Sequence, residues 1–148
     1  MSDSETVKIR LHHVGIAVSD MSDTEDLLGR LLGLSFTDHQ DVGAQKVRVA
    51  YSDSDGAALE LIEATSDSSP LYPVLPHPIQ AFIDKHGQGL HHLCFEVNNL
   101  DAVLEKVTGQ GVNTVGGGVL EGSHDGRVAF LSPNDASGLL IELREKTS

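Results

Sequence analysis

The sequence has 148 residues, which is the size of one ordinary domain and leaves no room for a multidomain enzyme. Its formal net charge of −12 excludes nucleic acid and anionic membrane surfaces as expected partners, because such a charge repels phosphate groups. No apolar run reaches the roughly 18 residues of a membrane-spanning helix. Cys94 is the single cysteine, and the N-terminus lacks the basic and apolar regions of a secretory signal, so we expect a cytoplasmic protein.

The first half of the chain is repeated in the second half. Three segments recur in the same order and at a nearly constant offset, which is difficult to obtain by chance. The matched segments are Leu11-His12-His13-Val14 and Leu90-His91-His92-Leu93, Arg48-Val49-Ala50-Tyr51 and Arg127-Val128-Ala129-Phe130, and Leu59-Glu60-Leu61 and Ile141-Glu142-Leu143. We therefore expect a tail over 1–8 and a single domain over 9–145, in which a linker at about 64–85 joins a first module (about 9–63) to a second module (about 86–145).

Each module is expected to form the order βαβββ. The expected strands are 9–18, 34–38, 46–52 and 57–63 in the first module, and 90–97, 114–115, 127–131 and 139–144 in the second. An apolar stripe, with polar cap candidates before it and glycine after it, predicts one helix after the first strand of each module. The first stripe is Leu27, Leu28, Leu31 and Leu32, between Asp20 or Ser22 and Gly33. The second stripe is Leu100, Val103, Leu104 and Val107, between Asn98 or Asn99 and Gly109 or Gly111.

These elements predict an α+β fold class. Two βαβββ modules would pair edge to edge into a cupped mixed sheet with the helices on its outer face. The three consecutive glycines at 116–118 are not followed by a helix pattern, so we expect a flexible loop rather than a phosphate-binding motif.

The first strand of each module carries two consecutive histidines, and strand alternation places them on opposite faces. His13 shares its face with small residues, and His92 lies on the matching face of the second module. His12 and His91 share the bulky apolar faces and are expected beneath the helices, where they would be hydrogen-bonded. The histidines without a symmetric partner are expected at the surface: His39, His77, His86 and His124.

Two imidazoles and two carboxylates recur at matching positions of the two modules. These residues are His13, Glu60, His92 and Glu142. A pseudo-twofold arrangement would bring all four side chains to the centre of the cup. A nitrogen and oxygen ligand set without thiolate suits Co²⁺, Mn²⁺, Ni²⁺, Fe²⁺ or Zn²⁺. One divalent metal explains all four positions, so we predict a metal site that leaves room for a chelating substrate.

Five segments of the chain resemble the vicinal oxygen chelate superfamily, which includes glyoxalases, bleomycin resistance proteins and dioxygenases. They are residues 11–18, 58–63, 86–97, 122–133 and 138–143. Within the superfamily, the sequence Gly-Ser-His-Asp-Gly-Arg-Val-Ala-Phe-Leu-Ser-Pro resembles methylmalonyl-CoA epimerases. The resemblance implies a paired βαβββ cup, a divalent metal bound by the four residues named above, and epimerisation at C2 of a malonyl-type thioester. We also expect a homodimer.

The implied reaction assigns roles to individual residues. A metal would stabilise the enolate that forms when a proton leaves the carbon next to the thioester. Glu142 is predicted as one acid or base, and the second is Glu60, a metal-bound water or a residue not yet identified. His124 and Arg127 lie in the segment that resembles the substrate loop and are predicted to bind the anionic end of an acyl-thioester, with Arg48 as a further cationic contributor.

Two other functions are compatible with the same sequence features. A glyoxalase I-like lyase acting on a glutathione hemithioacetal would use the same four ligands, whereas a metal-free binding protein of this fold would need none of them. Extradiol dioxygenase chemistry is disfavoured, because that class uses three protein ligands and Glu60 would add a fourth.

Overall fold

The computed structural model describes residues 8–147, so nearly all of the expected tail over 1–8 lies outside the described residues. The strands are β1 (Ile9–Ala17), β2 (Phe36–Val42), β3 (Val47–Ser52), β4 (Ala58–Ala64), β5 (Gly89–Val97), β6 (Thr114–Glu121), β7 (Arg127–Leu131) and β8 (Ile141–Glu145). The α-helices are α1 (Met21–Leu32), α2 (Pro78–His86) and α3 (Leu100–Gly109). Within this described part, every helix is too short or too polar to cross a membrane.

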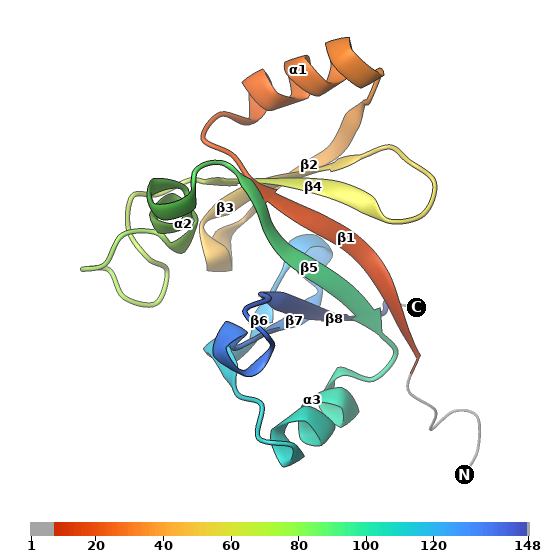
Figure 1. Cartoon of the computed structure of the whole chain (residues 1–148), viewed down its shortest axis with the longest axis vertical. Coiled ribbons are helices and arrows are strands. Elements are labelled where there is room, and N and C mark those ends of the chain that lie inside the picture. The colour runs from red at the N-terminus through yellow and green to blue at the C-terminus, as the bar shows by residue number, and fades with distance from the viewer. Residues whose placement is uncertain (1–7, 148) are drawn as a thin grey trace. The chain divides into compact units, whose positions relative to one another are not determined.

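The strands follow the same pairing scheme in both modules. Hydrogen bonds order them β2-β3-β4-β1-β5-β8-β7-β6 (Figure 1). The first strand of each module pairs in parallel with the last, β1 with β4 and β5 with β8. The remaining pairs within the modules are antiparallel. The predicted α+β class, with two βαβββ modules in one mixed sheet, is therefore confirmed.

The chain divides into two compact units whose boundaries fall inside β1 and β5. We call His13–His92 the inner unit and the described residues before and after it the outer unit. Both β1 and β5 contribute residues to each unit, and both units are held together mainly by their own strand pairs and apolar clusters.

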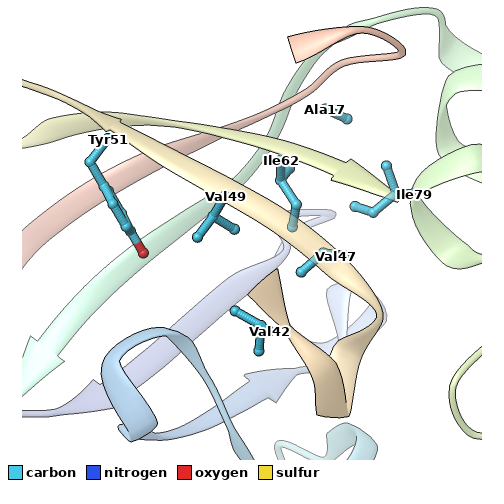
Figure 2. Packing of buried hydrophobic residues seen from close by; sticks show 7 residues of the cluster. All are labelled: Ala17, Val42, Val47, Val49, Tyr51, Ile62 and Ile79. Atoms are coloured by element: carbon cyan, nitrogen blue, oxygen red, sulfur yellow. The ribbon is translucent and has the colours of Figure 1, made fainter. Parts of the chain in front are cut away.

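In the inner unit, the sheet carries a buried apolar cluster on each face. One cluster joins Val18, Ala50 and Leu61 to Met21 of α1. The cluster on the other face is drawn in Figure 2 and packs against α2; it consists of Ala17, Val42, Val47, Val49, Tyr51, Ile62 and Ile79. The expectation that α1 covers the bulky face of β1 is thus confirmed, while the second face is covered in part by a helix that the sequence did not predict.

The predicted apolar stripe of α1 is not its buried face. The caps are as expected, since Asp20 accepts a hydrogen bond from the Asp23 backbone and Gly33 ends the helix in the left-handed conformation. However, Leu31 and Leu32 are 64% and 69% exposed. Met21 in the first turn is the buried residue of the helix, and Glu25 contacts His39 of β2 at 2.8 Å, whereas Leu31 and Leu32 at the end of the helix project away from the unit.

Helix α2 lies inside the segment expected as a linker, where the chain packs against β4 (Figure 1). Its N-cap is His77, whose Nδ1 accepts from the Ile79 backbone and whose Nε2 donates to the Gln45 carbonyl at 3.0 Å. His77 is buried, so its expected surface position is wrong. Histidine is not among the usual cap residues, and this is why the sequence pattern did not predict the helix.

In the outer unit, α3 buries the stripe that the sequence predicted. Leu100 and Val103 form a cluster with Val97, Leu131 and Leu143. Asn99 caps the helix by accepting from the Ala102 backbone.

The expected glycine loop is instead part of strand β6. Gly116, Gly117 and Gly118 have φ angles of 75°, 95° and 86°, and the β6–β7 pairing shifts register between Val115 and Leu120. The expectation of a flexible loop was wrong, because positive φ angles allow the glycines to form an irregular stretch within a strand.

Candidate metal centre

Four side chains converge on one face of the sheet in the inner unit. They are His13, Tyr51, Glu60 and His92. The register pairs Glu60 with Gly15 of β1 on one side and with Tyr51 of β3 on the other. His13 lies two residues before Gly15 and therefore points to the same face. His13, Glu60 and His92 are 0%, 5% and 5% exposed, so the group is removed from bulk water. These residues come from β1, β3, β4 and β5, which fix them on rigid strands rather than on loops.

The donor atoms of three of these side chains lie close together. His13 Nε2 and His92 Nε2 are 3.2 Å apart. Glu60 Oε1 lies 3.5 Å from His13 Nε2 and 3.2 Å from His92 Nε2. Metal–ligand bonds of about 2.1 Å separate neighbouring ligand atoms by about 3.0 Å in an octahedron and about 3.4 Å in a tetrahedron. The spacing and the chemistry of these donors therefore fit a divalent cation.

Glu60 is the acidic member of the group. Its burial alone would raise its pKa, but hydrogen bonds and charge from His13 and His92 outweigh burial and hold the pKa of Glu60 well below its usual range.

Tyr51 supplies a further contact that the sequence analysis missed. Its hydroxyl donates a hydrogen bond of 2.7 Å to Glu60 Oε2, whereas the imidazole contacts given above are with Glu60 Oε1. Its ring meets the His13 ring edge-on, with 5.5 Å between centroids. The available signal was the repeat itself, because Tyr51 matches Phe130 and the hydroxyl is the difference between them.

Gly15 is required by the close approach of His92. A Cβ at Gly15 would lie 2.0 Å from Cε1 and 2.3 Å from Nδ1 of the His92 ring, which is far inside contact distance. The imidazole thus occupies the space above β1 that any other residue would fill. The repeat has Cys94 at the matching position, so this requirement belongs to the first module.

His91 lies beside the site and contacts its neighbour. Its Nδ1 is 2.9 Å from Nδ1 of His92, and its ring packs edge-on against Phe82 of α2. The sequence placed His91 beneath the helix of its own module, whereas the structure places its ring against α2. When His92 Nδ1 carries the proton of this hydrogen bond, the lone pair of His92 Nε2 is available to a metal.

The other predicted site residues lie in different surroundings. Glu142 is buried in β8 of the outer unit, in register with Cys94 of β5 and Phe130 of β7. The inner unit thus brings together three of the four predicted ligands, and the role of Glu142 as ligand and base stays a prediction.

The predicted substrate-binding arginines form ion pairs. Arg127 contacts Asp101 at 2.8 Å and Glu145 at 3.0 Å, and Arg48 contacts Asp41 at 3.0 Å. These exposed pairs leave the predicted substrate roles of both arginines untested.

His124 lies in a short 3₁₀ turn whose first residue, Ser123, is hydrogen-bonded to Arg144. His124 and Asp125 both have positive φ angles, 57° and 54°. The buried guanidinium of Arg144 donates to Oγ and to the carbonyl oxygen of Ser123, each at 2.9 Å. Arg144 was also missed by the sequence analysis, and it holds the turn in a conformation that non-glycine residues rarely adopt. The predicted role of His124 in substrate binding stays a prediction.

Comparisons with known proteins agree with this architecture. The family model of the glyoxalase/bleomycin resistance protein/dioxygenase superfamily matches residues 12–130. The chain is 37% identical to the uncharacterised protein YqjC of Bacillus subtilis, covering 92% of this chain and 91% of the relative. It is 30% identical to an ethylmalonyl-CoA/methylmalonyl-CoA epimerase of Cereibacter sphaeroides, covering 92% and 97%.

Solved structures lead to the same group of proteins. The methylmalonyl-CoA epimerase of Mycobacterium tuberculosis superposes with a TM-score of 0.81 at 31% identity, covering 94% of this chain and 89% of that chain. The chain therefore belongs to the glyoxalase/bleomycin resistance protein/dioxygenase superfamily, and its homologues include methylmalonyl-CoA epimerases.

Proposed function

We propose that this protein is a metal-dependent epimerase that exchanges the proton at C2 of a malonyl-type CoA thioester. The observation that carries the proposal is the buried group in which His13 Nε2, His92 Nε2 and Glu60 Oε1 lie 3.2–3.5 Å from one another. The substrate class is supported by the Cereibacter sphaeroides relative, whose name states ethylmalonyl-CoA and methylmalonyl-CoA.

We propose Glu142 as the fourth ligand. The pairing of β5 with β8 supports this proposal. His92 and Cys94 are two residues apart on β5 and share a face, and Cys94 pairs with Glu142 on β8. Cross-strand partners point to the same face, so the Glu142 side chain is expected on the face that carries His92. The proposed metal is Co²⁺, Mn²⁺, Ni²⁺, Fe²⁺ or Zn²⁺, since imidazole and carboxylate ligands suit all of these.

A divalent cation held by this set would act as a Lewis acid that stabilises negative charge on the thioester oxygen. The chain's own groups handle the proton and the surroundings. Glu142 is proposed to take the proton from C2 on one face of the substrate, and a second group is proposed to deliver a proton to the opposite face, because inversion at C2 requires proton exchange on both faces. Glu60 is buried and is proposed to hold the cation through its carboxylate, and its further role as second acid or base is a proposal from the sequence. Burial of His13, Glu60 and His92 keeps bulk water away, which strengthens every charge interaction at the site.

His124, Arg127 and Arg48 are proposed to meet the anionic parts of the substrate. Both arginines are exposed and already neutralised by carboxylates, so a CoA phosphate would have to compete with Asp101, Glu145 or Asp41. Such exchange is feasible at a protein surface, where an ion pair contributes about 0–1 kcal/mol.

The reaction can be tested by hydrogen exchange. Protein loaded with Co²⁺ is incubated with methylmalonyl-CoA in D₂O, and deuterium at C2 is followed by mass spectrometry. We expect incorporation by the wild type and by His39→Ala, whose histidine pairs with Glu25 on the surface, but none above background by His92→Ala.

A parallel reaction distinguishes the alternatives. The hemithioacetal of methylglyoxal and glutathione is offered to the same preparation. Turnover of the hemithioacetal without exchange of methylmalonyl-CoA would replace the proposal with a glyoxalase I-like lyase. Absence of both reactions, in a protein that retains no metal after purification, would favour a metal-free binding protein.

We also propose that the chain forms a homodimer. The exposed leucines on α1 support self-association, because a soluble monomer rarely leaves neighbouring apolar side chains uncovered. Sedimentation velocity should give the mass of a dimer, and Leu31→Glu should lower it. A monomer at all concentrations would contradict the proposal.

A further inference from the structure

The two oxygens of Glu60 have different partners. Oε1 faces the two imidazole Nε2 atoms, whereas Oε2 accepts the phenol hydrogen bond of Tyr51. Tyr51 and Glu60 are direct partners in the β3–β4 pairing, so the phenol approaches from a fixed backbone position. The carboxylate is therefore held in one orientation by groups on both sides of it.

Packing alone does not explain the hydroxyl. The ring of Tyr51 fills a place at the margin of the inner unit's core, beside Val49 (Figure 2). The repeat fills the matching place with Phe130, which is likewise the direct partner of Glu142 in the β7–β8 pairing. A phenylalanine thus meets the packing requirement of this position, and the first module adds a buried hydroxyl that bonds to a carboxylate.

We infer that Tyr51 is a positioning residue that commits Glu60 to binding the cation through Oε1 alone. A carboxylate can bind a cation through one oxygen or through both. The hydrogen bond from Tyr51 takes up a lone pair of Oε2 and therefore disfavours binding through both oxygens, which keeps one coordination position available to the substrate. The inference rests on the proposed function as a metal-dependent epimerase, and it assigns a role to a residue that neither acts as a ligand nor exchanges a proton.

The test uses the full chain stripped of metal by a chelator and titrated with Zn²⁺ in competition with a chromophoric chelator. The chain has two tyrosines and no tryptophan, so the tyrosine band of its near-ultraviolet CD spectrum reports on Tyr51 and Tyr72. Tyr51→Phe keeps the ring and removes the hydroxyl. Tyr72→Phe is the matched control, because Tyr72 is 61% exposed.

We expect Tyr51→Phe to lower Zn²⁺ affinity by about 10- to 100-fold, as the loss of a hydrogen bond to a metal ligand does in other sites. Zn²⁺ should change the tyrosine band of the wild type and of Tyr72→Phe, and this change should be absent from Tyr51→Phe. Wild-type affinity in a folded Tyr51→Phe protein would overturn the inference.

A second variant covers the case in which Tyr51→Phe does not fold. Glu60→Gln leaves Tyr51 in place and removes the charged partner, so Zn²⁺ should no longer alter the tyrosine band. A wild-type response of the band in Glu60→Gln would overturn the inference, because Tyr51 would then sense the metal without Glu60. These readouts need no substrate: a protein that meets them but exchanges no deuterium would refute the proposed function and leave the role of Tyr51 standing.

Discussion

The two modules share a pairing scheme but differ at the positions that surround their carboxylates. In the first module, Tyr51 donates a hydrogen bond to Glu60, and Gly15 leaves space for the His92 ring. In the second, Phe130 and Cys94 occupy the matching positions. Glu60 and Glu142 thus occupy matching positions in the two modules, but the residues around them differ. We therefore expect the two glutamates to differ in chemical role.

The helices of the two modules also differ, in how deeply their apolar side chains are buried. Leu100 of α3 is completely buried, whereas Leu31 of α1 is 64% exposed, although both belong to the apolar stripe of a capped helix. The stripe predicts a helix in both modules, but only the packing of the whole unit determines which of its residues become core.

The largest expected effect comes from His92→Ala. It removes one of three converging donors, so Co²⁺ affinity should fall by more than about 100-fold, beyond the range for residues that only support a ligand. His91→Ala should retain Co²⁺, with affinity lowered by at most about 100-fold. Equilibrium dialysis and far-ultraviolet CD measure binding and folding. Equal Co²⁺ content in the two folded variants would contradict the assignment of faces.

Gly15→Ala tests the approach of His92 to β1. The added methyl group would occupy the position of the imidazole, so the ring must move and Co²⁺ affinity should fall by at least about 10-fold. Cys94→Ala is the matched change in the second module and should have a smaller effect on affinity. Calorimetric titration with Co²⁺ compares the two, and an unchanged affinity in Gly15→Ala would mean that the His92 ring lies elsewhere.

A pair of leucine substitutions sharpens the comparison of the helices. Leu100→Ala should lower the free energy of unfolding by about 2–5 kcal/mol, because it leaves a cavity in the core of the outer unit. At a protein concentration low enough to keep the chain monomeric, Leu31→Ala should change it by less than about 0.5 kcal/mol, since the side chain is exposed in the single chain. Urea denaturation measures both values. Equal losses would show that α1 packs as tightly as α3.

The smallest expected effect concerns the exposed pair of Asp101 and Arg127. The hydrogen bond from Arg127 lowers the pKa of Asp101, so the folded state holds this carboxylate ionised at a lower pH than the unfolded chain does. The stabilisation is present above the unfolded pKa of about 3.9 and is lost as the pH falls through the folded pKa. Asp101→Asn should therefore slightly lower the urea midpoint at pH 7, and the difference should disappear in acid. A difference that persists in acid would argue against this linkage.

The repeat predicted the strands and three residues of the candidate site because its spacing is preserved through two copies of one backbone. His13, Glu60 and His92 each occupy a position that strand alternation alone directs to one face. Tyr51 was missed because its role depends on a cross-strand hydrogen bond, which the spacing along one strand does not contain. The helix α2 was missed because a histidine caps it, and Arg144 because its partner Ser123 lies in a distant turn.

The most direct test of the metal site is an anomalous difference map from crystals of the Co²⁺-loaded protein. The account predicts a single strong peak within about 2.0–2.2 Å of His13 Nε2, His92 Nε2 and Glu60 Oε1, with Glu60 Oε2 still bonded to Tyr51. A peak at other residues, or a Glu60 side chain turned away from the ion, would contradict it.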